Sequence, residues 1–246
     1  MKVLEYLKGK SLKRPVHLTL LDPNKQQPKV AKSIAMEALE GCTDGIMIGG
    51  SAGINQDNLD ETARCIKGIT ELPVILFPGD VTGITRYADA LFFMSLLNSR
   101  NPYYITGAQA IGASFVKKAG IESIPMGYIV IEPGGAVGCI GDAKLIPRDC
   151  AEIAVSYALA AQNLGMKLVY LEAGSGVAEH VPSRMIAGVK AALDIPLIVG
   201  GGIRTPEDAL TVVKAGADII VTGTLVEKVE NVREGISSIT SVIKSR

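Results

Sequence analysis

The chain has 246 residues, of which 48% are hydrophobic and 20% charged, which is enough apolar material for a sizeable core. Its 25 basic and 25 acidic side chains balance, which argues against nucleic-acid binding and against strong attraction to anionic membranes. No apolar run reaches the ~18 residues that span a bilayer, and charges interrupt the apolar positions near the start, so no signal peptide is predicted. Four cysteines without a CxxC spacing are expected to be reduced and mostly buried, in a cytoplasmic protein.

Eight short apolar runs follow one another along the chain and are predicted to form strands. They cover residues 16–22, 45–51, 73–79, 90–97, 123–131, 167–174, 196–203 and 218–224. Several are apolar throughout, as is typical of parallel strands that are covered on both faces. Amphipathic stretches lie between them, among them 29–39, 57–69, 149–163 and 206–215. This alternation predicts an α/β fold, a (β/α)8 TIM barrel in which residues 1–246 form a single domain.

Local signals refine this barrel. Helices are expected to begin at Asp57, at Thr205 with Pro206, and at Asn231, and to end near Gly120, Gly165 and Gly216. Only about ten residues separate the third strand from the fourth, whereas a crossover with a full helix needs at least ~10–12. The third helix is therefore predicted to be missing or reduced to a turn. Residues 133–148 contain four glycines and are predicted to form a long, functional loop after the fifth strand.

The strongest functional signal comes from two glycine-rich turns in the seventh and eighth units. Gly200-Gly201-Gly202 leads from a strand into a helix, and Thr222-Gly223-Thr224 ends the next strand. Glycines allow backbone N–H groups to approach an anion closely, and the start of a helix adds a favourable dipole. The loops after strands seven and eight are the recurrent phosphate site of such barrels. One turn alone would be explained by tight-turn geometry, but two on adjacent strands favour phosphate binding.

The sixth strand ends in a polar motif, Tyr170-Leu171-Glu172-Ala173-Gly174-Ser175-Gly176. Tyr170 and Glu172 alternate to the same face of the strand. A carboxylate that points into a barrel mouth is costly to bury unless it meets a cation or a hydroxyl donor. This cost favours a functional role for Glu172 over a salt bridge at the rim. The amides of Ser175 and Gly176 are expected to add a third wall to the anion site.

Two further strand ends carry possible metal ligands. Asp22 ends the first strand before Pro23, and Ser51 ends the second. A carboxylate and a hydroxyl form a sparse ligand set, which suits Mg²⁺ because this ion retains waters and takes phosphate oxygens. The residues alone leave a second interpretation open, in which Asp22 caps a turn and Ser51 caps the second helix. His17, inside the first strand, is expected to be a packed, hydrogen-bonded side chain.

Taken in this order, the motifs resemble the geranylgeranylglyceryl phosphate synthase family, a group of modified barrels that join a polyprenyl diphosphate to sn-glycerol 1-phosphate. The resemblance covers nearly the whole chain and rests on residues 20–23, 49–51, 170–176, 199–204 and 222–224. Residues 170–176 discriminate most, because the glycine turns alone are generic. Members of the family also lack a normal third helix, in agreement with the short interval described above.

The resemblance implies a Mg²⁺-dependent prenyltransferase that joins geranylgeranyl diphosphate to the C3 hydroxyl of sn-glycerol 1-phosphate. This reaction forms the first ether bond of archaeal-type membrane lipids and releases diphosphate. The resemblance assigns Asp22 and Ser51 to Mg²⁺, and residues 170–176, Gly201-Gly202 and Gly223-Thr224 to glycerol phosphate. Glu172 is the candidate for orienting or deprotonating the hydroxyl. Candidates for the walls of a prenyl groove are Phe92, Phe93, Ile105 and Tyr128.

One departure separates two branches of this family. The branch that includes bacterial heptaprenyl enzymes has a lysine two positions before the metal aspartate, where this chain has Leu20. The chain resembles the second branch, whose members are often hexamers and sometimes dimers. Three other functions stay open on the residues: a sugar-phosphate isomerase or lyase with Asp22 and Glu172 as its acid–base pair, an FMN-dependent oxidoreductase, and a non-catalytic phosphometabolite-binding protein. The oxidoreductase is disfavoured because such enzymes usually place a lysine on a middle strand to face the flavin, and no predicted strand here has a lysine in that place.

Overall fold

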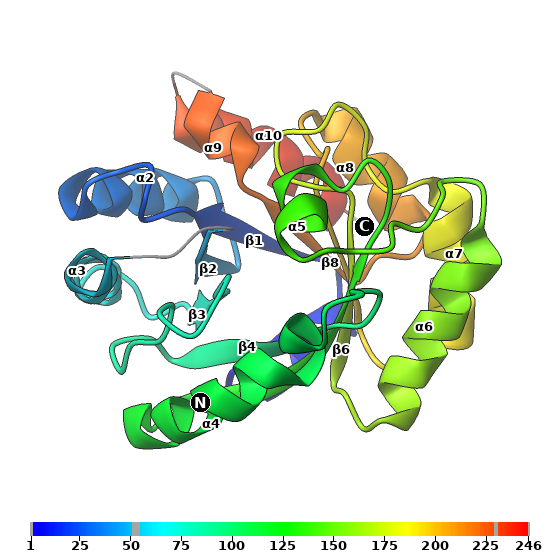
Figure 1. The fold of residues 1–246 in the computed structure, drawn as a ribbon. Helices are drawn as coiled ribbons and strands as arrows, with labels where there is room; N and C mark the ends of the chain where they lie inside the picture. The colour runs from blue at the N-terminus through cyan, green and yellow to red at the C-terminus, as the bar shows by residue number, and fades with distance from the viewer. Residues whose placement is uncertain (1, 51–54, 229–230, 246) are drawn as a thin grey trace.

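The computed structural model describes residues 2–50, 55–228 and 231–245. Eight parallel strands, hydrogen-bonded in sequence order, close into a barrel because the last strand pairs with the first (Figure 1). The strands are β1 (Val16–Leu21), β2 (Gly45–Ile48), β3 (Val74–Leu76), β4 (Ala90–Leu96), β5 (Glu122–Val130), β6 (Leu168–Glu172), β7 (Leu197–Gly200) and β8 (Ile219–Thr222). The predicted barrel of eight strands is confirmed, and each strand lies within or beside its predicted run.

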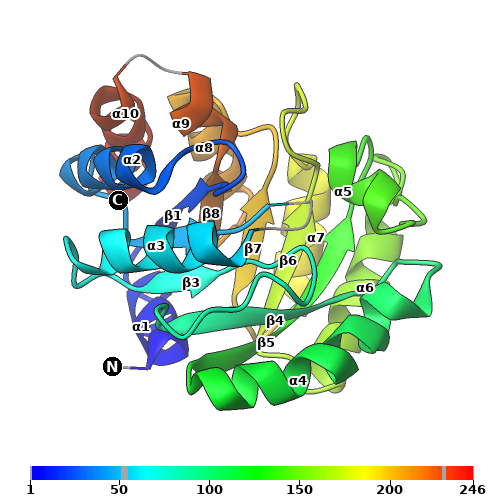
Figure 2. The ribbon, with the colours of Figure 1, turned by 60° about the vertical axis from the view of Figure 1, so that its left-hand side comes forward.

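Helices surround the barrel. They are α1 (Val3–Ser11), α2 (Pro28–Glu40), α3 (Gln56–Lys67), α4 (Ala108–Ala119), α5 (Gly135–Ile140), α6 (Ala151–Asn163), α7 (Ser183–Ala192), α8 (Pro206–Lys214), α9 (Thr224–Lys228) and α10 (Val232–Lys244), with a π-helical turn, η1 (Tyr103–Gly107), before α4. Helix α1 lies at the end of the barrel opposite α5 (Figure 2). No helix among the described residues is long and apolar enough to cross a membrane.

The core has two layers, because side chains alternate between the faces of each strand. Leu18, Met47 and Ile75 belong to the cluster inside the barrel, whereas Ile46 and Ile48 belong to the cluster between strands and helices. Two side chains of α1, Val3 and Leu7, join the inner cluster. Helix α1 thereby covers the amino-terminal end of the barrel.

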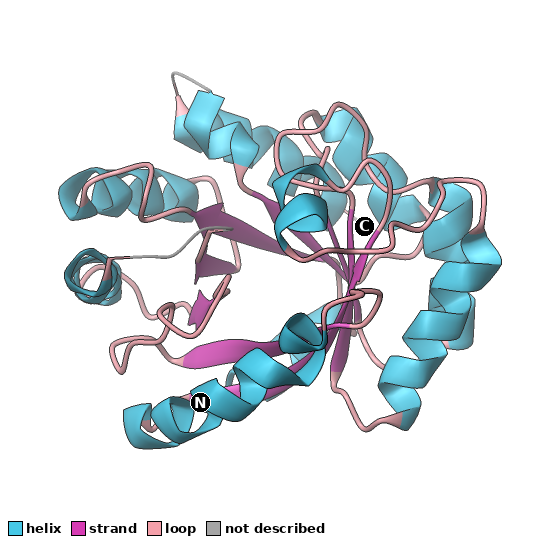
Figure 3. Ribbon diagram, in the orientation of Figure 1, coloured by secondary structure: helices cyan, strands magenta, loops and turns pink. Residues whose placement is uncertain are grey.

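The connection between β3 and β4, residues 77–89, contains no helix and is a loop throughout (Figure 3). The predicted loss of the third helix is therefore confirmed. The prediction for residues 133–148 was incomplete, because the short helix α5 interrupts this loop. Glycines have low helix propensity, and this helix contains two of them. A Cβ atom on Gly138 would lie 2.9 Å from a terminal methyl group of Leu145, so a larger residue there would shift that side chain.

Two of the three predicted helix starts are confirmed. Thr205 forms a capping box with Asp208, and the Asn231 side chain accepts a hydrogen bond from the backbone of α10. The prediction for Asp57 is wrong: Asn55 caps α3, and its side chain accepts from the Asn58 amide at 3.1 Å. Asn55 has the extended backbone that a cap requires, while Asp57 already lies in the first turn.

The four cysteines are free thiols, as expected, but their predicted burial is wrong. Cys42 and Cys139 are exposed, and Cys65 and Cys150 are half-buried. The reason is their position: all four lie in helices or at helix ends on the outside of the barrel, and none lies in a strand.

Candidate active site

Two cavities open at the carboxyl ends of the strands. The larger has a volume of about 570 Å³ and extends from the end of β1 past the β3–β4 connection to α4 and α5. The smaller, of about 50 Å³, lies among the turns that follow β6, β7 and β8. Four residues line both cavities, namely Leu20, Glu172, Ser175 and Gly223. The two cavities therefore adjoin, and Glu172 stands on their common wall.

The smaller cavity is built by the glycine turns that the sequence singles out. Gly201 and Gly202 have φ angles of +81° and +71°, in the region that favours glycine. A Cβ atom on Gly201 would lie 2.4 Å from Glu172 Oε1, and one on Gly202 would lie 2.2 Å from the Glu179 carbonyl carbon. Both glycines are thus required by backbone conformation and by close approach. With Gly223 and Thr224 they form the wall that faces Glu172.

Glu172 lies at the end of β6 with only 6% of its surface exposed. Its Oε1 atom accepts a hydrogen bond from the Gly174 amide at 2.6 Å. Its Oε2 atom accepts one from the Tyr128 hydroxyl at 3.0 Å, and the Tyr170 hydroxyl likewise favours the ionised carboxylate. Burial raises the pKa of Glu172 above its usual range, although these three donors act in the opposite direction. Glu172 is thus a buried, inward-facing carboxylate with hydroxyl donors around it. These donors offset the cost of burying its charge, as expected from the sequence.

Tyr128 and Tyr170 keep their hydroxyl protons and can therefore act as hydrogen-bond donors. Both are buried, and burial together with the charge of Glu172 raises the pKa values of Tyr128 and Tyr170 well above the usual range. Their rings contact each other at 5.1 Å between centroids, and the Phe77 ring stacks on Tyr170 at 5.5 Å. Sequence reasoning missed the bond from Tyr128 to Glu172. The strand register could have revealed it, because Tyr128 of β5 pairs with Tyr170 of β6.

Asp22 lies at the polar end of the larger cavity. Its Oδ1 atom accepts a hydrogen bond from the Asn24 amide at 3.0 Å. Gly50 packs against it so closely that a Cβ atom there would lie 2.6 Å from Asp22 Oδ1. The carboxylate of Asp80 and the ammonium of Lys25 line the same end. Ser51, the second predicted metal ligand, lies outside the described residues.

Apolar side chains form the rest of the larger cavity. Phe92, Phe93 and Tyr128, three of the four candidates for the groove, line it, but the fourth candidate, Ile105, is not among its lining residues. Ile105 belongs to η1, where its carbonyl accepts a hydrogen bond from Ser95. The absent third helix shapes this cavity. The β3–β4 connection contributes Val81 and Ile84 to the wall in place of a helix, opposite Gly112 of α4.

Comparison with known proteins shows the family of this chain. A sequence model described as the PcrB family matches residues 10–243. The chain belongs to the PcrB family. It is 57% identical to the geranylgeranylglyceryl phosphate synthase of Methanothermobacter thermautotrophicus over 97% of both chains. It is 56% identical to that of Pyrococcus horikoshii, over 95% of this chain and 92% of the relative.

A solved structure of a relative matches this PcrB-family barrel over its full length. The (S)-3-O-geranylgeranylglyceryl phosphate synthase from Thermoplasma acidophilum, in complex with its substrate sn-glycerol-1-phosphate, has a TM-score of 0.97 and 49% identity, with 100% of both chains covered. A tryptophan synthase alpha chain from Legionella pneumophila has a TM-score of 0.64 at 15% identity, which shows a shared fold alone.

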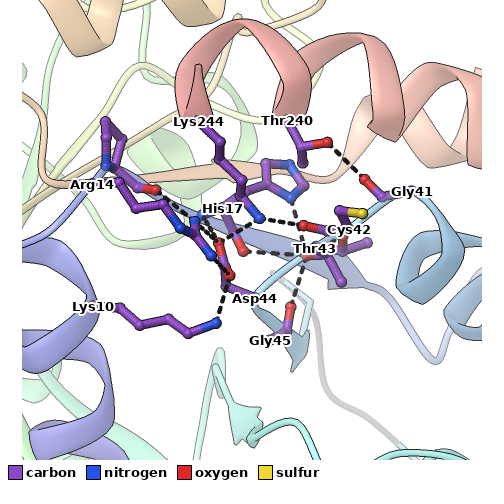
Figure 4. Close-up of polar contacts among 12 residues, drawn as sticks. Lys10, Arg14, His17, Gly41, Cys42, Thr43, Asp44, Gly45, Thr240 and Lys244 are labelled. Atoms are coloured by element: carbon purple, nitrogen blue, oxygen red, sulfur yellow. Dashed lines mark hydrogen bonds and ion pairs between the residues drawn. The ribbon is translucent and has the colours of Figure 1, made fainter. Parts of the chain in front are cut away.

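His17 does not take part in this site directly. It is completely buried, and its ring nitrogens lie 3.0 Å from the Thr43 hydroxyl and 2.9 Å from the Thr222 hydroxyl (Figure 4 shows the surrounding contacts). Burial, and secondarily the charge of Lys244, lower the pKa of His17 to about 3 although Asp44 raises it, so the ring is neutral at physiological pH. The PcrB-family chain thus uses this histidine as a packed, hydrogen-bonded residue, as the sequence predicts.

Beside His17, a buried carboxylate is surrounded by cations at the amino-terminal end of the barrel (Figure 4). The Asp44 side chain is 2% exposed, and ammonium or guanidinium nitrogens of Lys10, Arg14 and Lys244 lie 2.8–2.9 Å from it. Burial alone would raise the pKa of Asp44, but the hydrogen bonds from these cations outweigh it and hold the pKa well below its ordinary range. This cluster ties α1 and α10 to the start of β2.

Proposed function

We propose that this chain is a geranylgeranylglyceryl phosphate synthase, which transfers the geranylgeranyl group of geranylgeranyl diphosphate to the C3 hydroxyl of sn-glycerol 1-phosphate. One observation carries the proposal: Glu172 stands on the wall between a small glycine-lined cavity and a large apolar one. The small cavity suits a phosphate ester and the large one suits a prenyl chain. The names of relatives at 57% and 56% identity support the same reaction.

Glycerol phosphate is assigned to the small cavity. Its phosphate meets backbone amides of the turns after β6, β7 and β8, which include Gly174–Gly176, Gly201-Gly202 and Gly223-Thr224. Tyr170 and Glu172 line the cavity and supply the side chains against which the glycerol lies. The side chains of Leu171 and Ala173 pack in the outer cluster, so these two residues can contribute only backbone groups. The relative from Thermoplasma acidophilum, solved with sn-glycerol-1-phosphate, supports this assignment through its 49% identity over the whole chain.

The reaction forms one bond and breaks another. The C3 oxygen of glycerol phosphate bonds to C1 of the prenyl group as the bond from C1 to the diphosphate breaks. Glu172 orients the hydroxyl and accepts its proton, because a buried carboxylate with a raised pKa is a better base than an exposed one. The hydroxyls of Tyr128 and Tyr170 keep the carboxylate in place. Holding both substrates in adjoining cavities supplies much of the rate by proximity.

We further propose that Asp22 holds Mg²⁺ at the polar end of the large cavity, with Ser51 as the second protein ligand. Asp22 fits this role because its carboxylate lines the cavity and oxygen donors suit this ion. A ligand set of one carboxylate and one hydroxyl suits an ion that retains waters and binds diphosphate oxygens. When bound, Mg²⁺ would stabilise the charge on the departing diphosphate.

Two further properties belong to the proposal. We expect self-association, as a hexamer or a dimer, which is supported by exposed apolar side chains such as Ile111 and Phe115 on α4 and Ile153 on α6. We expect the protein to act in the cytoplasm, which is supported by four thiols that form no disulfide. Size-exclusion chromatography with light scattering tests the first property, and the thiol content of the native protein tests the second.

A product assay tests the proposed reaction. The protein is incubated with radiolabelled sn-glycerol 1-phosphate and geranylgeranyl diphosphate, with and without Mg²⁺, and lipid is then extracted. Label should enter the organic phase only when Mg²⁺ and both substrates are present, and sn-glycerol 3-phosphate should be a poor acceptor. Turnover of sugar phosphates without Mg²⁺ would instead favour an isomerase with Asp22 and Glu172 as its acid–base pair. A protein that binds glycerol phosphate but forms no product would favour a non-catalytic binding function.

A further inference from the structure

Arg204 lies two residues after Gly202, in the loop between β7 and α8, and lines the small cavity. Among the described residues that line this cavity, Arg204 is the only basic side chain and Glu172 the only acidic one. Leu20, where the other branch of the family has a lysine, contributes only an apolar wall. A phosphate dianion bound here would therefore share its cavity with one carboxylate and one guanidinium.

The contacts of Arg204 join two walls of the cavity. Its Nη2 atom donates hydrogen bonds to the carbonyl oxygens of Gly176 at 2.5 Å and Val177 at 2.6 Å, both in the loop after β6. Its own backbone amide donates to Asp208 Oδ2 at 3.0 Å, in the first turn of α8. The residue is thus fixed to the start of α8 by its backbone and reaches the β6–α7 loop with its side chain.

The loop that Arg204 holds has little conformational preference of its own. Gly174 and Gly176 have φ angles of +113° and +77°, and glycines lose more backbone freedom on ordering than any other residue. A Cβ atom on Gly176 would meet nothing within 4 Å, so packing does not fix this glycine. The charge-assisted hydrogen bonds from the Arg204 guanidinium therefore order the segment around Gly176 before substrate arrives, between the Gly174 amide that donates to Glu172 and the His180 carbonyl that accepts from Arg148.

The charge of Arg204 has a second consequence. Phosphate in this cavity lies near the carboxylate of Glu172, and two negative groups at close range repel each other in a buried site. Arginine stays protonated at every physiological pH. The Nε atom of Arg204 is buried and has no hydrogen-bond partner among the described residues.

We propose that Arg204 is a positioning residue for the phosphate of glycerol phosphate: it clamps the β6–α7 loop against the β7–α8 turn, and its charge offsets that of Glu172. The proposal rests on the proposed function, because that function places the phosphate in the small cavity. Arg204 acts through the loop, so its loss affects one substrate selectively. Glycerol phosphate binds more weakly, while the prenyl diphosphate, bound at the other end of the large cavity, is unaffected.

Three variants test this inference: R204Q, R204K and, as a matched control, R184Q. Arg184 is an exposed arginine on α7 whose partner is Glu152, away from both cavities. Calorimetry gives the Kd of sn-glycerol 1-phosphate, and steady-state kinetics give KM for each substrate. R204Q should weaken glycerol phosphate binding by roughly tenfold to a hundredfold, the range expected for a lost charge-assisted hydrogen bond, without changing KM for the prenyl diphosphate. R204K should recover part of the loss, because lysine keeps the charge but lacks the planar fork. R184Q should behave as wild type.

Hydrogen exchange tests the clamp without any ligand. Amides of residues 173–179 should exchange faster in R204Q than in wild type, with R204K between them, and R184Q should match wild type. Wild-type affinity for glycerol phosphate in R204Q, or an equal rise of both KM values, would overturn the substrate role. Unchanged exchange in R204Q would overturn the clamp. If R204Q does not fold, R204K decides both questions in the same way. A wild-type protein that binds no glycerol phosphate would instead refute the proposed function, and the exchange rates would still decide the clamp.

Discussion

The bond between Tyr128 and Glu172 makes a prediction about pH dependence. Tyr128→Phe removes the hydroxyl that donates to Glu172 Oε2 at 3.0 Å and leaves the ring in place. A hydrogen bond to a charged group contributes about 1.5–3 kcal/mol, and one pH unit corresponds to about 1.36 kcal/mol. Because this donor favours the ionised carboxylate, its loss raises the pKa of Glu172 further. The acid limb of kcat/KM should then move to higher pH by roughly one to two units.

The assay is the pH profile of kcat/KM for glycerol phosphate between pH 4 and 9, in buffers of constant ionic strength. At alkaline pH, where the carboxylate is ionised in both proteins, the variant should approach the wild-type rate. Tyr157→Phe is the matched control, since Tyr157 lies on α6 outside both cavities, and its profile should not move. An acid limb that stays in place in Tyr128→Phe would refute the role assigned to the Glu172 carboxylate.

Three further predictions concern other parts of the chain. Asp44→Asn leaves three half-buried cations without their buried carboxylate and should lower the free energy of unfolding by about 3 kcal/mol, or Tm by roughly 6–12 °C in calorimetry. The pKa of Asp44 is lower in the folded protein than in the unfolded chain, so wild type should lose the stability that Asp44 provides as pH falls below about 4. Asp44→Asn should not show this loss, and parallel curves of stability against pH for the two proteins would contradict the prediction. Gly201→Ala and Gly165→Ala both place alanine at a φ angle above +80°, which should lower the stability of each variant by about 1–2 kcal/mol. Only Gly201→Ala should abolish activity in the product assay, because only the Cβ atom at position 201 would meet Glu172. Asp22→Ala should abolish prenyl transfer and preserve the calorimetric Kd of glycerol phosphate, and equal loss of both would disprove separate sites.

Sequence patterns predicted most of the fold because each strand and turn here has a local cause. The strands are apolar on both faces, so their runs stand out. The glycines of the β7–α8 loop indicate positive φ angles. The period-two alternation of a strand is enough to place Tyr170 and Glu172 on the same, inward face. The short interval before β4 leaves no room for a helix.

What sequence reasoning missed depends on contacts between distant elements. Tyr128 is predicted only as a wall of the prenyl groove, and its bond to Glu172 depends on the β5–β6 register that brings it beside Tyr170. Helix α5 forms in spite of its glycines, and it packs against Leu145 from later in the same loop. The side chain of Arg204 crosses from one loop to another, and no spacing along the chain indicates this. The exposed positions of Cys42 and Cys139 likewise follow from which helix ends face outward.

The central claim is that two substrates occupy adjoining cavities with Glu172 between them. The measurement that tests it most directly is a crystal structure with Mg²⁺, sn-glycerol 1-phosphate and an unreactive thiodiphosphate analogue of the prenyl substrate. We predict both ligands bound together, with the C3 hydroxyl hydrogen-bonded to Glu172 and about 3–3.5 Å from C1 of the prenyl group. Mutually exclusive binding, or a C3 hydroxyl that faces away from Glu172, would contradict the claim.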